Sequence, residues 1–359
     1  MNLNLFIQNG TAGIMKKAGR YYLTSRKGLA FLATALPQLK RSASQREENE
    51  TNGVHIPVFL IASIASQCNL HCAGCYARAG GACCGTDRIP DLTADEWENI
   101  FREASDLGVS FCLLAGGEPL LRRDVIDAAS RIPGIIFPIF TNGTVIDKDT
   151  VTLFDRQRHL VPVLSVEGDQ EVTDQRRGSG VYTSIEQAMQ DMKVKRILFG
   201  ISVTVNHDNM DGVLTREFIA DLRQKGCGIV FYIEYVPAEK GTEALALRPS
   251  EQEELKRRVD GLKDSFDDLA ILSFPGDEEA MGGCLASGRG FFHINPHGGA
   301  EPCPFSPYSK YNLKDCSIKE VLSSSYFQDL RTIAQDAGPH TGGCVLFQRE
   351  QQVQALLTR

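Results

Sequence analysis

The sequence predicts an α/β fold in which parallel strands alternate with helices. Apolar runs rich in β-branched residues recur along the first two thirds of the chain, and helix-like stretches separate them. The runs cover residues 58–65, 111–115, 135–140, 160–166, 198–205 and 229–236. Because each run is apolar on both faces, we expect parallel strands that are buried on both sides. Six units are too few for a closed eight-stranded barrel, so the sequence favours an open, curved sheet.

Capping patterns indicate where several helices begin. Each pairs a Ser or Thr with a Glu three residues later, which is typical of a helix N-terminus. The four patterns are Thr93-x-x-Glu96, Thr183-x-x-Glu186, Ser250-x-x-Glu253 and Ser317-x-x-Glu320. Pro138 and Pro162 lie inside two of the expected strands and blur their boundaries, because proline cannot donate to a strand ladder.

The chain divides into three parts. Residues 1–53 are an N-terminal arm and linker, in which residues 13–39 predict an amphipathic segment and residues 41–53 a polar linker or exposed loop. The arm is expected to pack against the domain, with contact to a membrane surface or a greasy substrate as the alternative. Residues 54–265 hold the six strand–helix units. Residues 266–359, rich in Gly, Pro and Cys, predict a second, smaller unit.

Composition limits the classes of partner and compartment. The chain of 359 residues has a formal charge of −7 and no basic tract, which argues against a nucleic-acid partner. It has 11 cysteines, an odd number, and its start lacks the pattern of a signal peptide. Both features favour a reducing cytoplasm. The apolar run at residues 28–39 contains Pro37 and is shorter than the roughly 20 residues that span a bilayer.

Three cysteines directly after the first expected strand carry the strongest functional signal. Cys68, Cys72 and Cys75 have the spacing C-x3-C-x2-C. Three thiolates can hold three irons of a [4Fe–4S] cluster and leave the fourth iron open to a ligand. The alternatives are reduced structural cysteines or a zinc site with His71 as a further ligand. We expect the cluster.

Polar residues also follow the carboxyl ends of the other expected strands, where parallel sheets gather functional groups. Gly116 and Gly117 allow close approach to a ligand, and Glu118 is suited to an ammonium group. Ser165 and Glu167 are suited to sugar hydroxyls. The same edge receives Asn142, Asp174, Arg176, Arg177 and Tyr235. The two arginines among them are suited to a carboxylate.

With these motifs the chain resembles the radical S-adenosylmethionine (radical SAM) superfamily. CNLHCAGCY, AGGEP, TNG and SVEG occur in the family's order across residues 57–237. The resemblance implies a partial (β/α)6 TIM-type barrel with a [4Fe–4S] cluster at its mouth. It also implies reductive cleavage of SAM to a 5′-deoxyadenosyl radical, which abstracts hydrogen from a substrate. The chain departs from the family at Gly74, where many members have an aromatic residue, and at Cys83 and Cys84, which are unusual.

The resemblance assigns roles to individual residues. Cys68, Cys72 and Cys75 would ligate three irons, and the amino and carboxylate groups of SAM would bind the fourth. The SAM pocket would be formed by Tyr76, Gly116, Gly117, Glu118, Asn142, Ser165, Glu167 and Arg177. No catalytic residue is assigned, although Cys83 and Cys84 are candidates for quenching a radical.

Residues 266–359 resemble the SPASM/twitch extension, a small α+β unit that carries auxiliary clusters. The match comprises Cys284, a hairpin turning at Gly298-Gly299, and Pro302-Cys303-Pro304. The resemblance implies one auxiliary Fe–S cluster, with Cys284, Cys303 and Cys344 as ligands. Cys316 is either the fourth ligand or an ordinary residue, in which case a distant Cys, a non-Cys group or the substrate takes that place. Cys112 and Cys227 lie on or beside apolar runs and are expected to be buried thiols.

The leading interpretation is therefore a cytoplasmic radical SAM enzyme that modifies a peptide or protein by crosslinking or oxidation. Its partners would be that substrate and a reducing electron donor of the flavodoxin or ferredoxin type. Modification of a small metabolite, a tetrapyrrole or a lipid is one alternative. A non-enzymatic Fe–S electron carrier or scaffold is another, although such a protein needs no pocket for a ribose or an ammonium group. A zinc-bound interaction module is the third.

Overall fold

The computed structural model describes most of the chain. The described residues are 13, 17, 19–23, 25–85, 89–281, 283–335 and 344–358, without the side chains of residues 279–281 and 335. Residues 1–12, 14–16, 18 and 24 of the expected N-terminal arm therefore lie outside the described residues.

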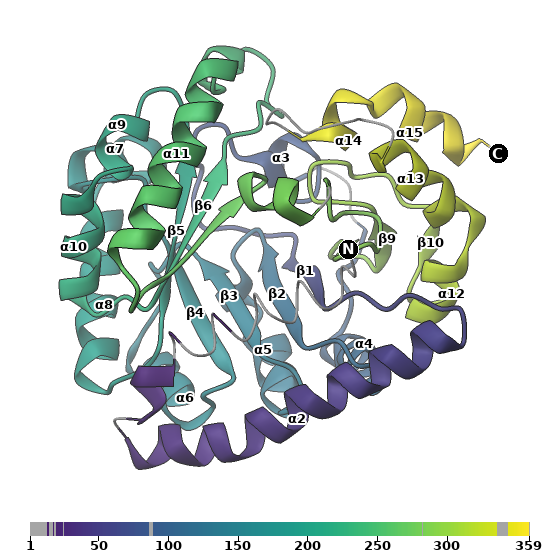
Figure 1. The fold of residues 1–359 in the computed structure, drawn as a ribbon, viewed down its shortest axis with the longest axis horizontal. Helices are drawn as coiled ribbons and strands as arrows, with labels where there is room; N and C mark the ends of the chain where they lie inside the picture. Colours follow the sequence, from purple (N-terminus) through teal and green to yellow (C-terminus); the bar gives the residue numbers. More distant parts are fainter. Residues whose placement is uncertain are drawn as a thin grey trace.

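Within the described residues, ten strands form one sheet in the order β10-β9-β8-β1-β2-β3-β4-β5-β6-β7. The neighbours from β1 to β7 are all parallel. Their bounds are β1 (Phe59–Ala65), β2 (Phe111–Gly116), β3 (Phe137–Thr141), β4 (Leu160–Ser165), β5 (Gly200–Val205), β6 (Ile229–Glu234) and β7 (Ala270–Phe274). The curved, open sheet is visible in Figure 1. The six expected strands and the α/β fold class are confirmed, and β7 adds a seventh parallel strand.

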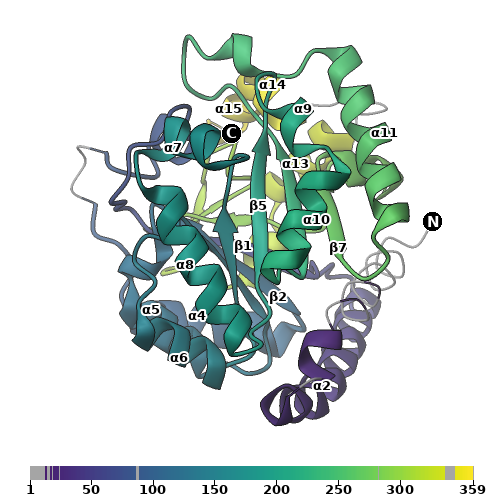
Figure 2. The same cartoon turned by 90° about the vertical axis from the view of Figure 1, so that its left-hand side faces the viewer.

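Helices between consecutive strands cover the outside of this sheet, as Figures 1 and 2 show. The main ones are α4 (Ala94–Leu107), α5 (Arg123–Ser130), α6 (Lys148–Arg156), α8 (Val181–Val194), α10 (Arg216–Lys225) and α11 (Pro249–Ser265). Shorter segments are η1 (Pro119–Leu121), α7 (Gln170–Arg177), α9 (Met210–Val213) and η2 (Glu243–Leu245). The right-handed connections place the carboxyl ends of the strands at one edge, where the site is built.

Two of the four expected helix starts are confirmed, at Thr93 and at Ser317, because both form complete capping boxes. The other two helices, α8 and α11, begin earlier in the chain than predicted. α8 begins at Val181, since the Asp174 carboxylate accepts hydrogen bonds from the backbone N–H groups of Gly180 and Tyr182. α11 begins at Pro249, which is favoured at the first helical position.

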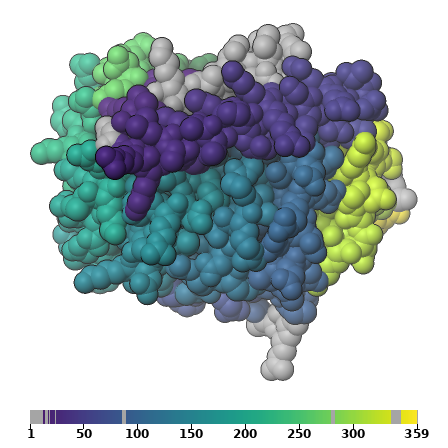
Figure 3. Space-filling view, turned by 90° about the horizontal axis from the view of Figure 1, so that it is seen from below, coloured from purple at the N-terminus to yellow at the C-terminus, as the bar shows by residue number. Residues whose placement is uncertain are grey.

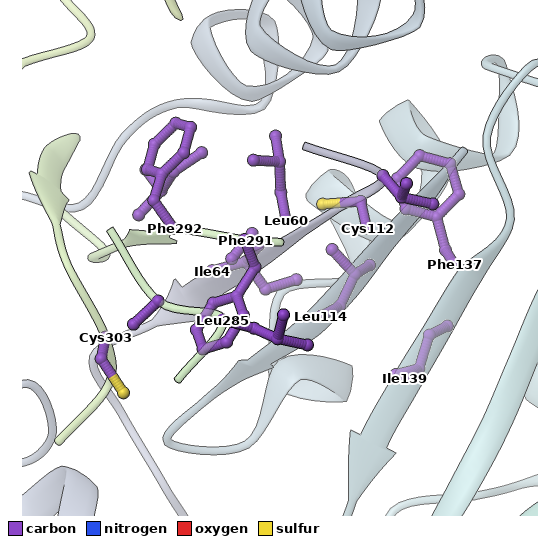
Figure 4. Close-up of a cluster of buried hydrophobic side chains, with 14 of the residues drawn as sticks. Leu60, Ile64, Cys112, Leu114, Phe137, Ile139, Leu285, Phe291, Phe292 and Cys303 are labelled. Carbon is purple, nitrogen blue, oxygen red and sulfur yellow. The ribbon is translucent and has the colours of Figure 1, made fainter. Parts of the chain in front are cut away.

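The strands divide their apolar side chains between two packed layers. Cys112, Leu114 and Phe137 belong to the outer layer, which packs against the helices, and Figure 4 shows part of it. Val163 and Phe231 belong to the inner layer, on the concave face. Because side chains alternate across a strand, one apolar run supplies both layers. The expectation that Cys112 and Cys227 are buried thiols is confirmed, since both are fully buried.

An N-terminal helix closes the lower end of the concave face. α2 (Arg26–Thr51) begins at Ser25, whose hydroxyl accepts a hydrogen bond from the Gly28 N–H, and it continues through Pro37. Figure 3 views the molecule from below and shows this purple segment running along one side of the underside. Tyr22, just before the helix, lies with its ring centroid 4.7 Å from that of Phe31, and both rings join the inner layer. None of the described helices combines the length and apolar character that crossing a membrane requires.

The prediction of a linker or exposed loop at residues 41–53 is wrong, because residues 41–51 form the second half of α2. A buried cation explains the difference. Arg46 is 3% exposed and donates hydrogen bonds to the Gly108 carbonyl and, over 2.9 Å, to the Ser110 hydroxyl. The charged residues of this segment therefore include one that anchors the helix to the sheet.

The C-terminal part extends the same sheet. β8 (His293–Ile294) pairs in parallel with β1, β9 (Gly299–Glu301) pairs antiparallel with β8, and β10 (Tyr311–Asn312) with β9. The hairpin turn at Gly298 is confirmed, with φ of 91°. The remaining elements are η3 (Gly276–Met281), α12 (Ile318–Ser323), α13 (Ser325–Gln335), α14 (Val345–Gln348) and α15 (Glu350–Leu357). Their buried side chains join the outer layer, so this part shares its core with the strand–helix units.

Candidate functional site

The cysteine loop leaves β1 at the carboxyl edge of the parallel strands. Cys68, Cys72 and Cys75 are all half-buried, and Cys75 is the N-cap of the short helix α3 (Tyr76–Ala79). Burial raises the pKa of Cys68, and the other two thiols lie close enough to raise it further. The structure therefore brings the three predicted ligands together, while His71 is exposed.

Hydrogen bonds from two other strand ends hold this loop in place. The Ala73 N–H donates to the Arg176 carbonyl over 3.1 Å, and Arg176 Nε donates back to the Ala73 carbonyl over 3.2 Å. The Gly74 N–H donates to Glu239 Oε2 over 3.0 Å. The loop is thus fixed between α7, which follows β4, and the segment that follows β6.

Gly116 and Gly117 allow a close approach, but the approaching group is the cysteine loop itself. The Gly117 N–H donates to the Ala65 carbonyl over 2.7 Å, and the Glu118 N–H to the Gln67 carbonyl over 2.8 Å. A Cβ at residue 116 would meet the Ala65 oxygen at 2.5 Å, and one at residue 117 would meet the Gln67 oxygen at 2.1 Å. Any side chain at these positions would push the loop away.

Glu118 joins two of the sequence motifs. Its carboxylate is 1% exposed and accepts hydrogen bonds from the Thr141 hydroxyl at 2.7 Å, the Asn142 N–H at 2.8 Å and the Leu120 N–H at 3.0 Å. Burial raises its pKa. The carboxylate assigned by resemblance to the amino group of SAM therefore also connects AGGEP with TNG.

Glu167 lies between two arginines. It is 1% exposed, and its Oε1 lies 2.8 Å from Arg177 Nε and 2.6 Å from the Arg176 guanidinium. Its other oxygen, Oε2, is buried without a hydrogen-bond partner. Buried polar atoms are nearly always paired, so this oxygen fits a donor supplied by a ligand, such as a ribose hydroxyl. Arg177 also lies within electrostatic reach of Cys72 and Cys75, which places the pair beside the cysteine loop.

Asn142 and Ser165 lie at the same edge. Asn142 Nδ2 donates to Asn69 Oδ1 over 2.9 Å and lies 3.9 Å from Cys68 Sγ. Ser165 ends β4, is half-buried and is in register with Ser202 of β5. Asn142 is thus next to the cysteine loop, and Ser165 is two residues before Glu167 at the end of β4.

Tyr76 connects the cysteine loop with the C-terminal part. Its ring centroid lies 5.1 Å from that of Phe305. Burial raises its pKa, and the thiols of Cys75 and Cys303 raise it further. Tyr76 is therefore near one predicted ligand from each of the two cysteine groups.

Cys83 and Cys84 form a close pair beside the loop. Their sulfur atoms are 2.9 Å apart, and Cys83 is 2% exposed. Cys84 has a φ of 57°, and its N–H donates to the Ser66 carbonyl over 2.8 Å. A role in quenching a radical stays a prediction.

The C-terminal cysteines divide into a group of three and one that is apart. The thiols of Cys284, Cys303 and Cys344 lie within electrostatic reach of one another. The Cys316 thiol instead donates to the Asn312 carbonyl over 3.1 Å, and the charges that act on it come from acidic side chains. The structure brings three of the four predicted auxiliary ligands together and leaves Cys316 outside the group.

Sequence reasoning missed two carboxylates at these places. Glu239 accepts the hydrogen bond from Gly74, and the buried Glu278 lies within electrostatic reach of Cys284 and Cys344. Neither follows a strand directly or belongs to a motif. The only signal for Glu278 was its distance of six residues from Cys284.

The predicted cysteine ligands fit iron–sulfur clusters better than single metal ions. In the part of the chain that the structure describes, no three His, Cys, Asp or Glu side chains converge on a position suited to one metal ion. A cubane places one ligand on each iron, so its ligands need not converge on a point. Two sets of three neighbouring thiols, one half-buried and one largely buried, match that kind of donor set.

Comparisons with known proteins agree with this geometry. The profile of the radical SAM superfamily matches residues 63–224. The chain is 24% identical over 306 residues to an AdoMet-dependent heme synthase of Methanosarcina barkeri, covering 77% of this chain and 85% of that protein. It is 26% identical over 312 residues to the mycofactocin maturase MftC of Mycolicibacterium smegmatis, covering 81% and 76%.

Solved structures share the fold. Streptococcus suis SuiB bound to S-adenosylmethionine is similar with a TM-score of 0.68 and 18% identity, covering 87% of this chain and 79% of that one. Native anSMEcpe with bound AdoMet is similar with a TM-score of 0.62 and 19% identity, covering 78% and 84%.

A parallel α/β sheet with a three-cysteine loop at its carboxyl edge defines an enzyme that works with an iron–sulfur cluster. Residues 63–224 are a radical SAM domain. Its cofactors are accordingly a [4Fe–4S] cluster and S-adenosylmethionine, and the interpretation as a non-enzymatic carrier is set aside.

Proposed function

We propose that this enzyme uses a radical derived from S-adenosylmethionine to modify a peptide or protein, by crosslinking or oxidation. The observation that carries the proposal is the placement of Cys68, Cys72 and Cys75 beside Glu167, whose buried Oε2 has no partner. When bound, the cluster and S-adenosylmethionine supply a 5′-deoxyadenosyl radical that abstracts hydrogen from the substrate.

The chain's own residues bind and orient the cofactors. Cys68, Cys72 and Cys75 would hold the cluster, with the loop fixed in advance by the hydrogen bonds of Ala73 and Gly74. Glu167 Oε2 would accept a ribose hydroxyl, and Arg177 would bind a carboxylate of S-adenosylmethionine. A loop that is already ordered binds with a smaller loss of conformational entropy.

The concave face below the loop is suited to radical chemistry because it is apolar. Phe140, Phe231, Ile233, Leu272 and Phe274 all pack on this face. Phe31, Leu32 and Leu39 of α2 pack against the same cluster. An apolar, closed site excludes water and prevents side reactions of a reactive intermediate.

Relatives support a peptide substrate. The 26% identical relative is a maturase, and a structure of SuiB bound to its precursor peptide SuiA shares the fold with a TM-score of 0.67. Residues 266–359 would then be a SPASM/twitch-type extension that carries one auxiliary cluster near Cys303. A tetrapyrrole is the second candidate, because the heme synthase is similar over 85% of its length and the concave face carries several aromatic rings.

The electron for the reaction would come from a flavodoxin or ferredoxin. A reducing cytoplasm fits this donor, and it fits the eleven cysteines, all of which are free thiols in this structure.

The test begins with anaerobic reconstitution of the full chain. With dithionite and S-adenosylmethionine we expect 5′-deoxyadenosine, measured by chromatography, and none after Cys72→Ala. Cys316→Ala is the matched control, because this thiol lies outside both groups and its loss should leave the product unchanged. A wild-type chain that holds iron but yields no 5′-deoxyadenosine would sink the proposal.

Substrate class is tested separately by mass spectrometry. Short peptides encoded beside the gene are expected to lose hydrogen or gain a crosslink in the complete reaction. In a parallel set of reactions, coproporphyrin III and its iron complex are tested as substrates. If the porphyrin is modified and the peptides are not, the substrate is a tetrapyrrole and not a peptide.

A further inference from the structure

We propose that the Tyr235 hydroxyl donates a hydrogen bond to a sulfur atom of the cluster held by the cysteine loop, and that this bond raises the reduction potential of the cluster. The inference rests on the proposed function in one respect, because it takes Cys68, Cys72 and Cys75 to be the ligands of that cluster. It goes further by giving a role to a side chain that lies outside the four sequence motifs.

Tyr235 lies at the carboxyl edge of the sheet, where the cysteine loop also lies. It directly follows β6, and its backbone N–H donates to the Val205 carbonyl over 2.8 Å. Its ring contacts Gly74, since a Cβ at residue 74 would lie 2.3 Å from Tyr235 Oη and 2.9 Å from the ring carbons Cε2 and Cζ. Gly74 directly precedes Cys75 and follows Cys72 by two positions. The hydroxyl therefore lies against the part of the loop between two cluster ligands.

This hydroxyl is buried without a partner. Tyr235 is 3% exposed, and none of the groups that the structure describes forms a hydrogen bond with its Oη. Burying a hydroxyl costs free energy unless it is hydrogen-bonded, and the hydroxyl of a buried tyrosine usually finds a partner. An unpartnered hydroxyl against a ligand loop therefore fits an acceptor that arrives with the cofactor.

The sulfur atoms of the loop are unequally supplied with donors. Cys68 Sγ accepts from the Leu70 N–H over 3.4 Å, and Asn142 Nδ2 lies 3.9 Å from the same sulfur. In the described part of the chain, neither the Cys72 sulfur nor the Cys75 sulfur has such a donor. The tyrosine hydroxyl would supply one at that end of the loop.

Two backbone donors at the same end of the loop are already engaged. The Ala73 N–H donates to the Arg176 carbonyl over 3.1 Å, and the Gly74 N–H donates to Glu239 Oε2 over 3.0 Å. Neither N–H can turn toward a cluster without breaking its present bond. A donor from outside the loop is therefore needed there, and Tyr235 places one against it.

Cluster sulfurs suit this donor better than S-adenosylmethionine does. The amino, ribose and carboxylate groups of S-adenosylmethionine have proposed partners in Glu118, Glu167 and Arg177, at the ends of β2 and β4. Tyr235 comes from β6 and touches the residue directly before a cluster ligand. Thiolate and sulfide sulfurs carry negative charge, and hydrogen bonds to them are among the features that set the potential of a cluster.

The experiment removes the hydroxyl and keeps the ring. A hydrogen bond stabilises the reduced cluster more than the oxidised one, because the reduced cluster carries one more negative charge. After anaerobic reconstitution, we expect Tyr235→Phe in the full chain to hold as much iron as the wild-type chain. Its cluster should have a more negative reduction potential in an EPR-monitored titration. The signal of this cluster is the one that Cys72→Ala abolishes.

Exchange into D2O gives a second readout. A hydroxyl proton that is bonded to the cluster exchanges with the solvent and couples to the unpaired electron of the reduced cluster. Pulsed EPR spectra of the wild-type chain in H2O and in D2O should therefore differ by a coupling that Tyr235→Phe lacks. A structural effect on the fold would not remove one exchangeable coupling.

Tyr232→Phe is the matched control. Tyr232 lies on β6, is fully buried and donates its hydroxyl to the Val213 carbonyl over 2.6 Å, away from the cysteine loop. Its loss should lower the urea midpoint and leave the potential of the cluster unchanged. Equal shifts of potential in the two variants would overturn the proposal, because the effect would then come from the strand and not from the hydroxyl beside Gly74.

Two further results would overturn the proposal. One is a Tyr235→Phe chain with the potential and the exchangeable couplings of the wild type. The other is an unchanged potential together with a higher Kd for S-adenosylmethionine, because the hydroxyl would then bind that cofactor and not the cluster.

Failure of this inference is distinguishable from failure of the proposed function. The potential and the couplings are measured without S-adenosylmethionine and without turnover. A wild-type chain that assembles the cluster but forms no 5′-deoxyadenosine would refute the proposed function, and Tyr235→Phe would still decide this inference. A wild-type potential in Tyr235→Phe would refute the inference while 5′-deoxyadenosine is still formed.

Discussion

The ring of Tyr235 lies directly against Gly74 of the cysteine loop. A Cβ at residue 74 would come within 2.3 Å of Tyr235 Oη. Tyr235 follows β6, is 3% exposed, and its hydroxyl has no hydrogen-bond partner. The chain lacks the aromatic residue that the family often has before the third cysteine, and here an aromatic ring reaches that place from another strand. Tyr235 therefore leaves room only for a glycine at residue 74.

Gly74→Ala should prevent assembly of the first cluster. The added methyl group would collide with Tyr235, and the backbone φ of +64° is unfavourable for any residue with a Cβ. We expect loss of about four irons per chain and of 5′-deoxyadenosine, while the iron held by Cys284, Cys303 and Cys344 remains. Iron analysis and chromatography after anaerobic reconstitution measure both quantities.

Gly81→Ala separates the collision from the backbone strain. Gly81 has a similar φ of +75°, but a Cβ there would have no neighbour within 4 Å. The variant should therefore keep its iron and its activity. Equal losses in the two variants would show that backbone strain, and not the contact with Tyr235, governs the loop.

Glu167→Gln should weaken binding of S-adenosylmethionine. The change replaces a buried carboxylate whose Oε2 has no donor and whose Oε1 holds Arg176 and Arg177. Hydrogen bonds to charged groups contribute about 1.5–3 kcal/mol, so we expect a Kd at least roughly tenfold higher. Equilibrium binding to the reconstituted protein measures the Kd.

The control for this prediction is Glu171→Gln, which neutralises an exposed carboxylate in the adjacent helix α7. Its effect on the Kd should be small, because exposed charges are screened by solvent. An unchanged Kd in Glu167→Gln would mean that this carboxylate only organises the two arginines.

The strands and the cysteine loop could be predicted because they depend on local signals. An apolar run such as 229–236 is buried on both faces whatever surrounds it, and C-x3-C-x2-C is readable from spacing alone. The start of α8 could not be predicted in this way. It is set by Asp174, whose carboxylate caps the chain from the preceding helix.

Long-range contacts explain the other differences. The second half of α2 has the composition of a loop. It packs as a helix because Arg46 donates to Gly108 and Ser110, and Gln45 and Asn49 donate to the neighbouring backbone. Cys303 and Cys344 lie far apart in the sequence, and their thiols come near each other only after folding. Gly116 and Gly117 were correctly expected to permit a close contact, but the partner is the backbone of the cysteine loop.

Stability should fall as the pH falls through the ordinary histidine range because of His159. Burial lowers the pKa of this side chain from 6.5, and its Nε2 has no partner. Below about pH 6.5 the unfolded chain binds a proton that the folded chain resists, so the free energy of unfolding decreases with falling pH. Urea midpoints between pH 5 and 8 should show a shallower dependence in His159→Asn. Parallel curves for the two proteins would contradict the assignment.

His293→Ala should detach the C-terminal hairpin from β1. His293 Nε2 lies 2.8 Å from the Ser63 hydroxyl and its Nδ1 lies 2.7 Å from Glu301 Oε2, and all three residues are at most 3% exposed. Without the imidazole, a buried carboxylate and a buried hydroxyl lose a partner, which costs about 3 kcal/mol. The urea midpoint should fall accordingly, and iron at the auxiliary site should fall with it, because Cys303 directly follows this hairpin.

His297→Ala, a half-exposed change at the turn of the same hairpin, should leave both the urea midpoint and the iron content nearly unchanged. Equal midpoints for the two variants would mean that the ladder between β1 and β8 alone joins the parts.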